Sequence, residues 1–109
     1  MTSFGLTDRE REMICDVPRR LAGVMEAKIF GSRAKGNIRP NSDIDLALGG
    51  TISRIELGTI VGELEEVPLP YLFDVELYDS LHYQALREHI DRVGKKFYVR
   101  VNGESSGTT

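Results

Sequence analysis

The chain has 109 residues, the size of one ordinary domain and long enough to bury a hydrophobic core without disulfides or structural metals. Hydrophobic residues make up 40% of it and charged residues 28%, which is close to globular averages and excludes a wholly disordered protein. The formal net charge is −3, which argues against a general nucleic-acid-binding protein. A single nucleotide bound through metal ions remains compatible with that charge.

Cysteine content and hydropathy bear on where the protein is found. Cys15 is the only cysteine, so no intrachain disulfide can form, which fits a reducing compartment. Its position in a predicted amphipathic helix favours a small core residue over a reactive thiol. The sequence has no run of about 18 apolar residues that would predict a membrane helix. It also has no basic segment leading into an apolar stretch, the pattern of a signal peptide. We therefore expect a cytoplasmic protein with no membrane partner.

The first predicted element is an amphipathic helix. Thr7 and Glu10 match a capping box, so the helix is expected to begin near Asp8. Pro18 interrupts the helical pattern, and it either kinks this helix or begins a second short one. Gly23 is the expected stop. Apolar residues at helical spacing are expected to form the buried face: Met13, Ile14, Val17, Leu21 and Val24.

Two strands joined by a glycine turn are expected next. Residues 27–30 are predicted as a short strand that runs into Gly31, and residues 32–35 as a single helical turn. A proline-containing exposed loop is predicted over residues 37–41. Apolar and acidic residues alternate over residues 43–48, which predicts a second strand with one apolar face.

The second half of the chain alternates helices and strands. Ser53 and Glu56 form another capping box at the start of a helix. The expected elements are a helix over 54–66, a strand over 72–77, a helix capped by Ser80 that runs to Val93, and a strand over 97–101. Small polar residues over 102–109 predict a disordered tail. This order predicts a single α/β (α+β) domain over residues 1–101, with helices packed against a sheet.

Two short runs concentrate the chemistry, GSRAKG at 31–36 and SDIDL at 42–46. Gly31 allows the chain to approach phosphate groups closely. Backbone N–H groups of a turn that enters a helix can bind phosphate oxygens, and the Ser32 hydroxyl can donate a further hydrogen bond. The first run therefore predicts a turn that binds the phosphates of a nucleoside triphosphate.

The second run predicts a metal site. Asp43 and Asp45 are two residues apart on a strand, so their carboxylates point to the same face. Such hard oxygen ligands suit Mg²⁺ or Mn²⁺. Acidic residues are poorly suited to β structure, which makes a merely solvated strand face the weaker interpretation. Metal-assisted phosphoryl transfer commonly uses a third carboxylate, and Asp74 on the next predicted strand is the candidate, with Glu76 as the alternative.

The candidate nucleotide-binding set extends beyond the turn itself. Arg33 and Lys35 place positive charge next to the turn, where phosphates would need it. Basic residues on loops are usually only solvated, so both interpretations stay open for these two side chains. The complete candidate set is Gly31, Ser32, Arg33, Lys35 and Ser42.

Together, the two runs resemble the signature of the polymerase-β-like nucleotidyltransferases. The matching pattern is a Gly-Ser turn with Ala34 and Gly36, followed by the acidic pair and Leu46. Two further segments also fit, Ile29-Phe30 before the turn and Phe73-Asp74-Val75 later in the chain. The chain looks most like the smallest members, the minimal nucleotidyltransferase (MNT) domain proteins, and the similarity extends over roughly residues 6–101.

This resemblance implies a mixed β-sheet with helices packed against it and an active site at its edge. It also implies Mg²⁺-dependent transfer of a nucleotidyl group, commonly adenylyl from ATP, to a hydroxyl acceptor. Asp43 and Asp45 match the metal-binding pair of the family, and Asp74 matches its third catalytic carboxylate. Gly31 and Ser32 match its phosphate-contacting turn.

The resemblance further suggests a partner protein. Small MNT proteins frequently pair with a HEPN-domain protein, a helical ribonuclease toxin, and resemble antitoxins that adenylylate a tyrosine of that partner. Two alternatives stay open: a binding module that neutralises a partner by occlusion, and a small-molecule modifier similar to the antibiotic nucleotidyltransferases. Larger relatives bind their acceptor on a second domain, and the lack of one here makes the small-molecule alternative less favoured.

Overall fold

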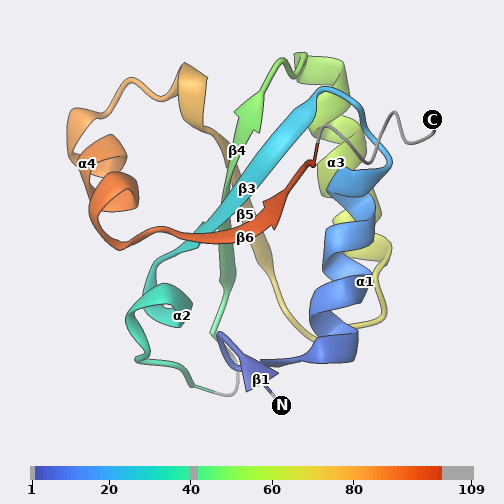
Figure 1. The fold of residues 1–109 in the computed structure, drawn as a ribbon, viewed down its shortest axis with the longest axis vertical. Coiled ribbons are helices and arrows are strands. Elements are labelled where there is room, and N and C mark those ends of the chain that lie inside the picture. Colours follow the sequence, from blue (N-terminus) through green and yellow to red (C-terminus); the bar gives the residue numbers. More distant parts are fainter. Residues whose placement is uncertain (1, 40–41, 102–109) are drawn as a thin grey trace.

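The computed structural model describes residues 2–39 and 42–101, which build a four-stranded sheet with helices around it (Figure 1). A two-stranded hairpin near the N-terminus, which the sequence did not predict, accompanies this sheet. The elements in chain order are β1 (Thr2–Ser3), β2 (Leu6–Thr7), α1 (Asp8–Arg19), β3 (Val24–Phe30), α2 (Ser32–Lys35), β4 (Ile44–Gly50), α3 (Arg54–Glu66), β5 (Phe73–Leu77), the 3₁₀ turn η1 (Tyr78–Ser80), α4 (Gln84–Val93) and β6 (Lys95–Val99).

The sheet is mixed, as predicted, with the strand order β5-β4-β3-β6. β3 runs antiparallel to both of its neighbours, β4 and β6. β4 and β5 are parallel, and α3 makes the crossover connection that a parallel pair requires. The two central strands are therefore the ones that flank the Gly31 turn.

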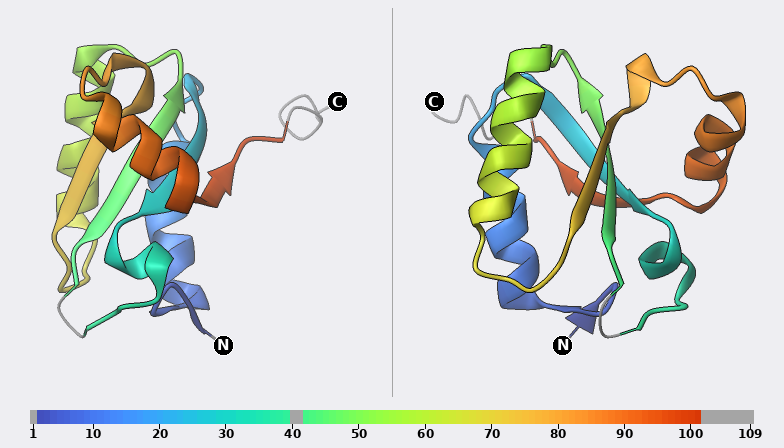
Figure 2. Two further views of the ribbon diagram at one scale, coloured as in Figure 1. Left: turned by 90° about the vertical axis from the view of Figure 1, so that its left-hand side faces the viewer. Right: turned by 180° about the vertical axis from the view of Figure 1, so that it is seen from behind.

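β4 shows how the two faces of the sheet differ. Its Ala47 points to one face and packs against Phe30 and against Ile90 of α4. Figures 1 and 2 show α1 and α3 together on one side of the sheet and α4 on the other. Because α4 is short, its side of the sheet is covered only in part. The opposite face carries three apolar side chains that are buried with residues of α1 and α3 in the main core: Ile44, Leu46 and Leu48.

Both predicted capping boxes are confirmed. The side chain of Thr7 accepts a hydrogen bond from the Glu10 backbone at 3.1 Å, and the Glu10 side chain accepts one from the Thr7 backbone at 2.9 Å. Ser53 and Glu56 make the same reciprocal pair at the start of α3. The helices therefore begin where local sequence places them.

The end of the first helix differs from the prediction. α1 is one continuous helix that contains Pro18 in its last turn and ends at Arg19, so Gly23 is not its stop. Gly23 instead lies in the connection before β3, where its carbonyl accepts a hydrogen bond from Thr51. β3 also begins at Val24, earlier than predicted, because residues 24 and 26 pair with the two glycines at the end of β4.

The start of the last helix was predicted wrongly. Ser80 does not cap a helix; it ends η1, and α4 begins only at Gln84 without a side-chain cap. The Leu81 N–H closes the 3₁₀ turn on the Tyr78 carbonyl, and the Leu81 side chain packs against the small core under α4. This packing outweighs the local capping preference of a serine.

Some predictions concern parts of the chain outside the described residues. The end of the loop predicted over 37–41 and the tail predicted over 102–109 are among them. The single-domain assignment of residues 1–101 stays a prediction. Cys15 is buried in the main core, where burial raises the pKa of its thiol. None of the helices in the described part of the chain has the length and apolar character needed to cross a bilayer.

Arg100 joins the end of β6 to the connection between α1 and β3. Its Nε donates to the Val24 carbonyl at 3.0 Å. Its Nη2 donates to three further carbonyl oxygens, those of Pro18, Arg19 and Leu21, at 2.9–3.2 Å. The Pro18 and Leu21 carbonyls also accept backbone hydrogen bonds from Leu21 and Val24, so the guanidinium reinforces the turn that follows α1 as well as the end of the helix.

We expect Arg100→Ala to lower the free energy of unfolding by about 2 kcal/mol, because several charge-assisted hydrogen bonds are lost together. Arg92 is an exposed arginine of α4, and Arg92→Ala should change stability by no more than about 0.5 kcal/mol. Urea denaturation followed by circular dichroism measures both. Equal effects of the two substitutions would show that the Arg100 contacts do not stabilise the fold.

Candidate active site

The sheet places the three predicted carboxylates at the same end of two neighbouring strands. Asp45 on β4 pairs in parallel register with Asp74 on β5, and neighbouring strands lie about 4.8 Å apart. Asp43 directly precedes β4 and, by alternation, faces the same side as Asp45. Asp43 and Asp74 also line the same surface hollow. Glu76 lies two residues further along β5, where it pairs with Ala47 of β4.

The carboxylates repel one another. Asp45 is half-buried, and its pKa is raised first because burial disfavours the charged form and then because Asp74 and Asp43 carry the same charge. The positive charge of Arg33 acts in the opposite direction. Burial and the charge of Asp74 likewise raise the pKa of Glu76. Within the described residues no salt bridge reaches any of these carboxylates.

The donor chemistry of the cluster fits a divalent cation. Carboxylate oxygens are the ligands that Mg²⁺ and Mn²⁺ prefer, and a cation would relieve the repulsion that raises the pKa of Asp45. In this structure no three His, Cys, Asp or Glu side chains among the described residues are gathered in metal-ligand geometry. The case for a metal site therefore rests on the donor set and its electrostatics.

Gly31 connects the turn to the acidic strand. Its φ of +76° lies in the left-handed region that favours glycine. A Cβ atom at this position would collide with the Oδ2 atom of Asp45. Residue 31 therefore has to be glycine for two independent reasons, and the turn lies directly against the Asp45 carboxylate.

The turn opens onto a shallow depression of about 650 Å³, which Ser32 and Ser42 both line. The Ser42 Oγ accepts a hydrogen bond from the Arg39 backbone at 2.8 Å and so has a structural partner. Lys35 is exposed at the end of α2. The predicted phosphate roles of Ser32, Ser42 and Lys35 are compatible with these positions and stay predictions.

Arg33 has a different position from the one a phosphate contact requires. Only 2% of its surface is exposed. Its Nε and Nη2 donate to the Ser42 carbonyl at 3.2 and 2.9 Å, and its Nη1 donates to the Phe4 carbonyl at 2.9 Å. The guanidinium is thus occupied inside the protein, and we do not retain Arg33 as a phosphate ligand.

The partners of Arg33 come from three distant segments, and sequence reasoning did not find them. The guanidinium carbon lies 4.7 Å from the centre of the Tyr71 ring, and the Tyr71 hydroxyl donates to Glu10 of α1 at 3.2 Å. Arg33 therefore joins α2 to the N-terminal hairpin, to the segment before β5 and to the residue that precedes Asp43. No sequence pattern pairs Arg33 with Tyr71, because only tertiary packing brings them together.

A family model that matches most of the chain identifies the family of this protein. The family model described as polymerase beta, nucleotidyltransferase matches residues 12–102, which contain the glycine turn and all three carboxylates. The chain belongs to this nucleotidyltransferase family. The match confirms the resemblance drawn from the two short runs and agrees with the mixed sheet observed here.

Solved structures share this nucleotidyltransferase fold at low sequence identity. A toxin–antitoxin structure with AMP-PNP superposes with a TM-score of 0.68 at 20% identity, covering 88% of this chain and 78% of that chain. A mutant of the toxin–antitoxin MntA-HpeT gives 0.65 at 17% identity, with the same coverage of 88% and 78%. A Sulfolobus solfataricus protein assigned as a candidate nucleotidyltransferase gives 0.51 at 22%, covering 83% and 77%. A search of curated proteins finds no match.

We expect Arg33→Lys to lower the free energy of unfolding of this nucleotidyltransferase by about 1–3 kcal/mol. Lysine keeps the charge but cannot reach the Ser42 and Phe4 carbonyls together. The exposed neighbour offers a matched control, and Lys35→Ala should change stability by no more than about 0.5 kcal/mol. If Arg33→Lys is as stable as the wild type yet binds ATP poorly, the guanidinium contacts phosphate after all.

Asp45→Asn should stabilise the protein when metal is absent. A raised folded-state pKa means that Asp45 contributes most stability below its ordinary pKa and loses that contribution as the pH rises through the raised value. At pH 7 in EDTA the substitution removes an unfavourable charge, and the melting temperature should rise by about 2–4 °C.

In saturating Mg²⁺ the wild type should instead be more stable than Asp45→Asn. The ion stabilises a folded protein that binds it, and Asp45→Asn weakens that binding. Asp16→Asn is the control, since Asp16 pairs with Arg19 on α1 far from the turn in sequence, and it should not raise the melting temperature. Differential scanning calorimetry with EDTA and with Mg²⁺ measures both effects. Lower stability of Asp45→Asn in EDTA would contradict the repulsion inferred here.

Proposed function

We propose that the protein is an Mg²⁺-dependent nucleotidyltransferase that moves an adenylyl group from ATP to a hydroxyl acceptor. The observation that supports this most directly is the register of Asp45 with Asp74, directly beside the Gly31 turn. The groups that we assign to phosphate and to metal therefore lie at the same end of neighbouring strands. Membership of the nucleotidyltransferase family supports the same class of reaction.

Each residue has a role in this proposal. Asp43, Asp45 and Asp74 hold Mg²⁺, or Mn²⁺ in its place, and the bound ion neutralises the phosphates and the charge that develops during transfer. Gly31 and Ser32 bind phosphate oxygens through their backbone and hydroxyl groups. Ser42, which lines the same depression as Ser32, and the exposed Lys35 at the end of α2 are further candidates.

The chemical step is an in-line displacement. The acceptor oxygen forms a bond to the α-phosphorus of ATP while the bond from that phosphorus to the β-phosphate oxygen breaks, and pyrophosphate leaves. Asp74 takes the proton of the acceptor hydroxyl as general base. The exposure of Asp74 at the edge strand leaves it open to an incoming acceptor.

The acceptor in this proposal is a tyrosine of a HEPN-domain toxin, which makes the protein an antitoxin. The similar structures with toxin–antitoxin partners, one of them with AMP-PNP, support a toxin partner and a nucleotide substrate. A cytoplasmic location, where ATP and Mg²⁺ are supplied, belongs to the same proposal.

The test uses ATP labelled with ³²P at the α-phosphate, Mg²⁺ and the product of the neighbouring gene. We expect label on the partner, and Asp43→Asn should reduce labelling by about 10²–10³-fold, because asparagine keeps the shape but loses the charge that attracts the cation. Asp16→Asn is the matched control and should label at the wild-type rate. Tight binding of the partner without label from any of the four nucleotides would indicate neutralisation by occlusion instead.

A further inference from the structure

Of the three candidate carboxylates, Asp43 receives the least support from the sheet. It is exposed and directly precedes β4, and the pairing of that strand with β5 begins one residue later, at Ile44. A side chain that binds a cation has to be held in one position beforehand, because ordering it on binding costs conformational entropy. The backbone on either side of Asp43 therefore has to supply this support.

Both peptide groups that flank Asp43 have hydrogen-bond partners. In the group that follows it, the Ile44 N–H donates to the Leu72 carbonyl at 2.8 Å. In the group that precedes it, the Ser42 carbonyl accepts hydrogen bonds from Nε and Nη2 of Arg33 at 3.2 and 2.9 Å. Because a peptide group is planar, fixing these two groups restricts both backbone torsion angles of Asp43. Arg33 therefore supplies one of the two constraints on the position of this carboxylate.

The Arg33 guanidinium is itself anchored by the N-terminal hairpin. Its Nη1 donates to the Phe4 carbonyl at 2.9 Å. Phe4 and Gly5 form the two-residue turn of the hairpin, with φ angles of +57° and +77° that suit a type I′ turn. A Cβ atom at Gly5 would lie 2.9 Å from Nη1 of Arg33 and 2.8 Å from Cγ2 of Ile38. The turn is therefore in close contact with the guanidinium that holds the Ser42 carbonyl.

This arrangement is costly, and filling space does not account for it. Phe4 adopts a positive φ, which is unfavourable for a bulky residue. Arg33 buries a charge at 2% exposure, and none of the salt bridges among the described residues includes it. An apolar side chain would occupy the same volume without desolvating a charge. Only arginine has donors on three nitrogens that can reach both carbonyls together. Its hydrogen bonds, rather than its volume, therefore distinguish arginine at this position.

Family membership does not by itself imply support from the hairpin. The family model matches residues 12–102, which include Arg33 and Asp43. Phe4 and Gly5 lie outside the matched segment. The contact between the hairpin and the candidate site is therefore an observation on this chain.

We propose that Arg33 is a positioning residue of the metal site and that the N-terminal hairpin is part of its support. The hairpin turn holds the guanidinium, and the guanidinium holds the Ser42 carbonyl. That carbonyl fixes the backbone from which Asp43 presents its carboxylate to a divalent cation. The inference rests on the proposed function, because it requires Asp43 as a metal ligand.

The first measurement is the affinity for Mn²⁺ alone, without nucleotide, by electron paramagnetic resonance of the free ion. Arg33→Lys keeps the positive charge but cannot bond to the Ser42 and Phe4 carbonyls together. We expect its dissociation constant for Mn²⁺ to rise about tenfold, the usual effect of losing a group that orients a metal ligand. Equal affinity of Arg33→Lys and the wild type would overturn the proposal.

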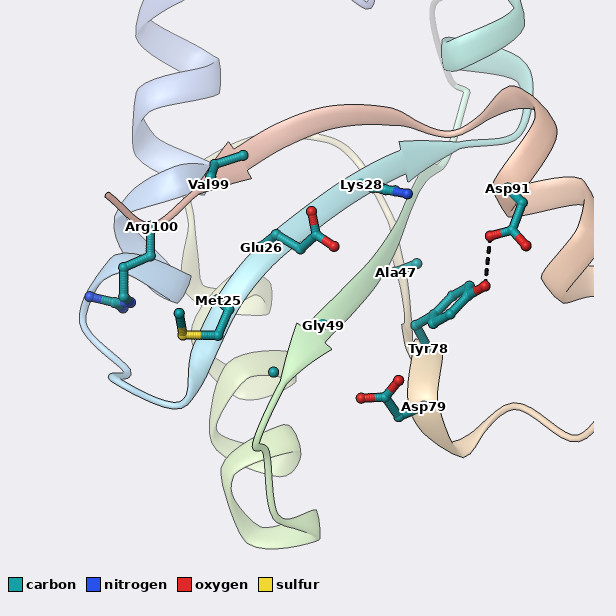
Figure 3. A pocket seen from close by; sticks show the side chains of 11 residues that line it. Met25, Glu26, Lys28, Ala47, Gly49, Tyr78, Asp79, Asp91, Val99 and Arg100 are labelled. Atoms are coloured by element: carbon teal, nitrogen blue, oxygen red, sulfur yellow. Dashed lines mark hydrogen bonds between the residues drawn. The ribbon is translucent and has the colours of Figure 1, made fainter. Parts of the chain in front are cut away.

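Arg100→Ala is the matched control for lost stability, since it also removes guanidinium bonds to backbone carbonyls. Figure 3 shows Arg100 beside Met25, at the start of β3, whereas Gly31 follows the other end of that strand. Arg100→Ala should therefore leave the Mn²⁺ affinity within about twofold of the wild-type value. If it weakens Mn²⁺ binding as much as Arg33→Lys does, the affinity follows overall stability and Arg33 has no positioning role.

Arg33→Met separates position from charge. Burial and the charges of Asp74 and Asp43 raise the pKa of Asp45, and the positive charge of Arg33 opposes them. By electrostatics alone, removing that charge would strengthen the binding of a cation. Loss of support has the opposite effect, and we expect Arg33→Met to bind Mn²⁺ more weakly than the wild type. Tighter binding would show that Arg33 acts only through its charge and would overturn the proposal.

Gly5→Ala tests the part played by the hairpin. The added Cβ atom forces the turn away from Arg33 and Ile38, and we expect the Mn²⁺ dissociation constant to rise about threefold. Gly58→Ala is the matched control, because a Cβ atom at this position of α3 meets open space in the described structure. Equal Mn²⁺ affinities of the two variants would overturn the role of the hairpin.

Asp43→Asn separates this inference from the proposed function. If Asp43→Asn binds Mn²⁺ as tightly as the wild type, the metal role of Asp43 fails and both proposals fall with it. Weak binding by Asp43→Asn together with normal binding by Arg33→Lys would overturn only the role of Arg33.

Transfer assays add a kinetic distinction. Arg33→Lys should require more Mg²⁺ for labelling of the partner, and at saturating Mg²⁺ its labelling rate should recover with an unchanged KM for ATP. A raised KM for ATP at saturating Mg²⁺ would assign the guanidinium to phosphate and overturn the proposal.

Discussion

The close packing of Gly31 against the Asp45 carboxylate is the constraint on which the site depends. Phe30 and Asp45 are paired across β3 and β4, so the chain leaves the sheet at the point where the acidic strand enters it. With a left-handed backbone and no side chain, Gly31 lets the turn pass directly over the carboxylate. The turn proposed to bind phosphate therefore lies against a carboxylate proposed to bind metal. A side chain at position 31 would strain the backbone and displace the Asp45 carboxylate.

The surrounding structure holds together an arrangement that is unfavourable in itself. Asp45, Asp43 and Asp74 repel one another, and burial makes the charge on Asp45 more costly still. Ile44 and Leu46 alternate with these carboxylates and are buried in the main core, so the strand cannot turn its acidic face elsewhere. Arg33 adds a buried positive charge and fixes the carbonyl that precedes Asp43. The candidate metal ligands of β4 are thus presented by a strand whose position is set by apolar packing.

The sequence predicted correctly the features that depend on residues close together in the chain. Capping boxes, the alternation along β4 and the glycine turn involve residues within a few positions of one another, and the structure contains all of them. Predictions failed where distant packing decided the outcome. Ser80 does not begin a helix, because Leu81 packs into the small core beneath α4. The β1–β2 hairpin has no strong signal in the local sequence.

The sequence by itself determined the candidate site of this nucleotidyltransferase: a glycine turn proposed to bind phosphates, two carboxylates on one strand face and a third on the next strand. Each of these depends on the type and spacing of neighbouring residues. Only the tertiary structure decided which basic residues are available to a substrate. Arg33 and Lys35 are equivalent in sequence, yet Arg33 is buried because Phe4, Ser42 and Tyr71 converge on it, whereas Lys35 remains exposed.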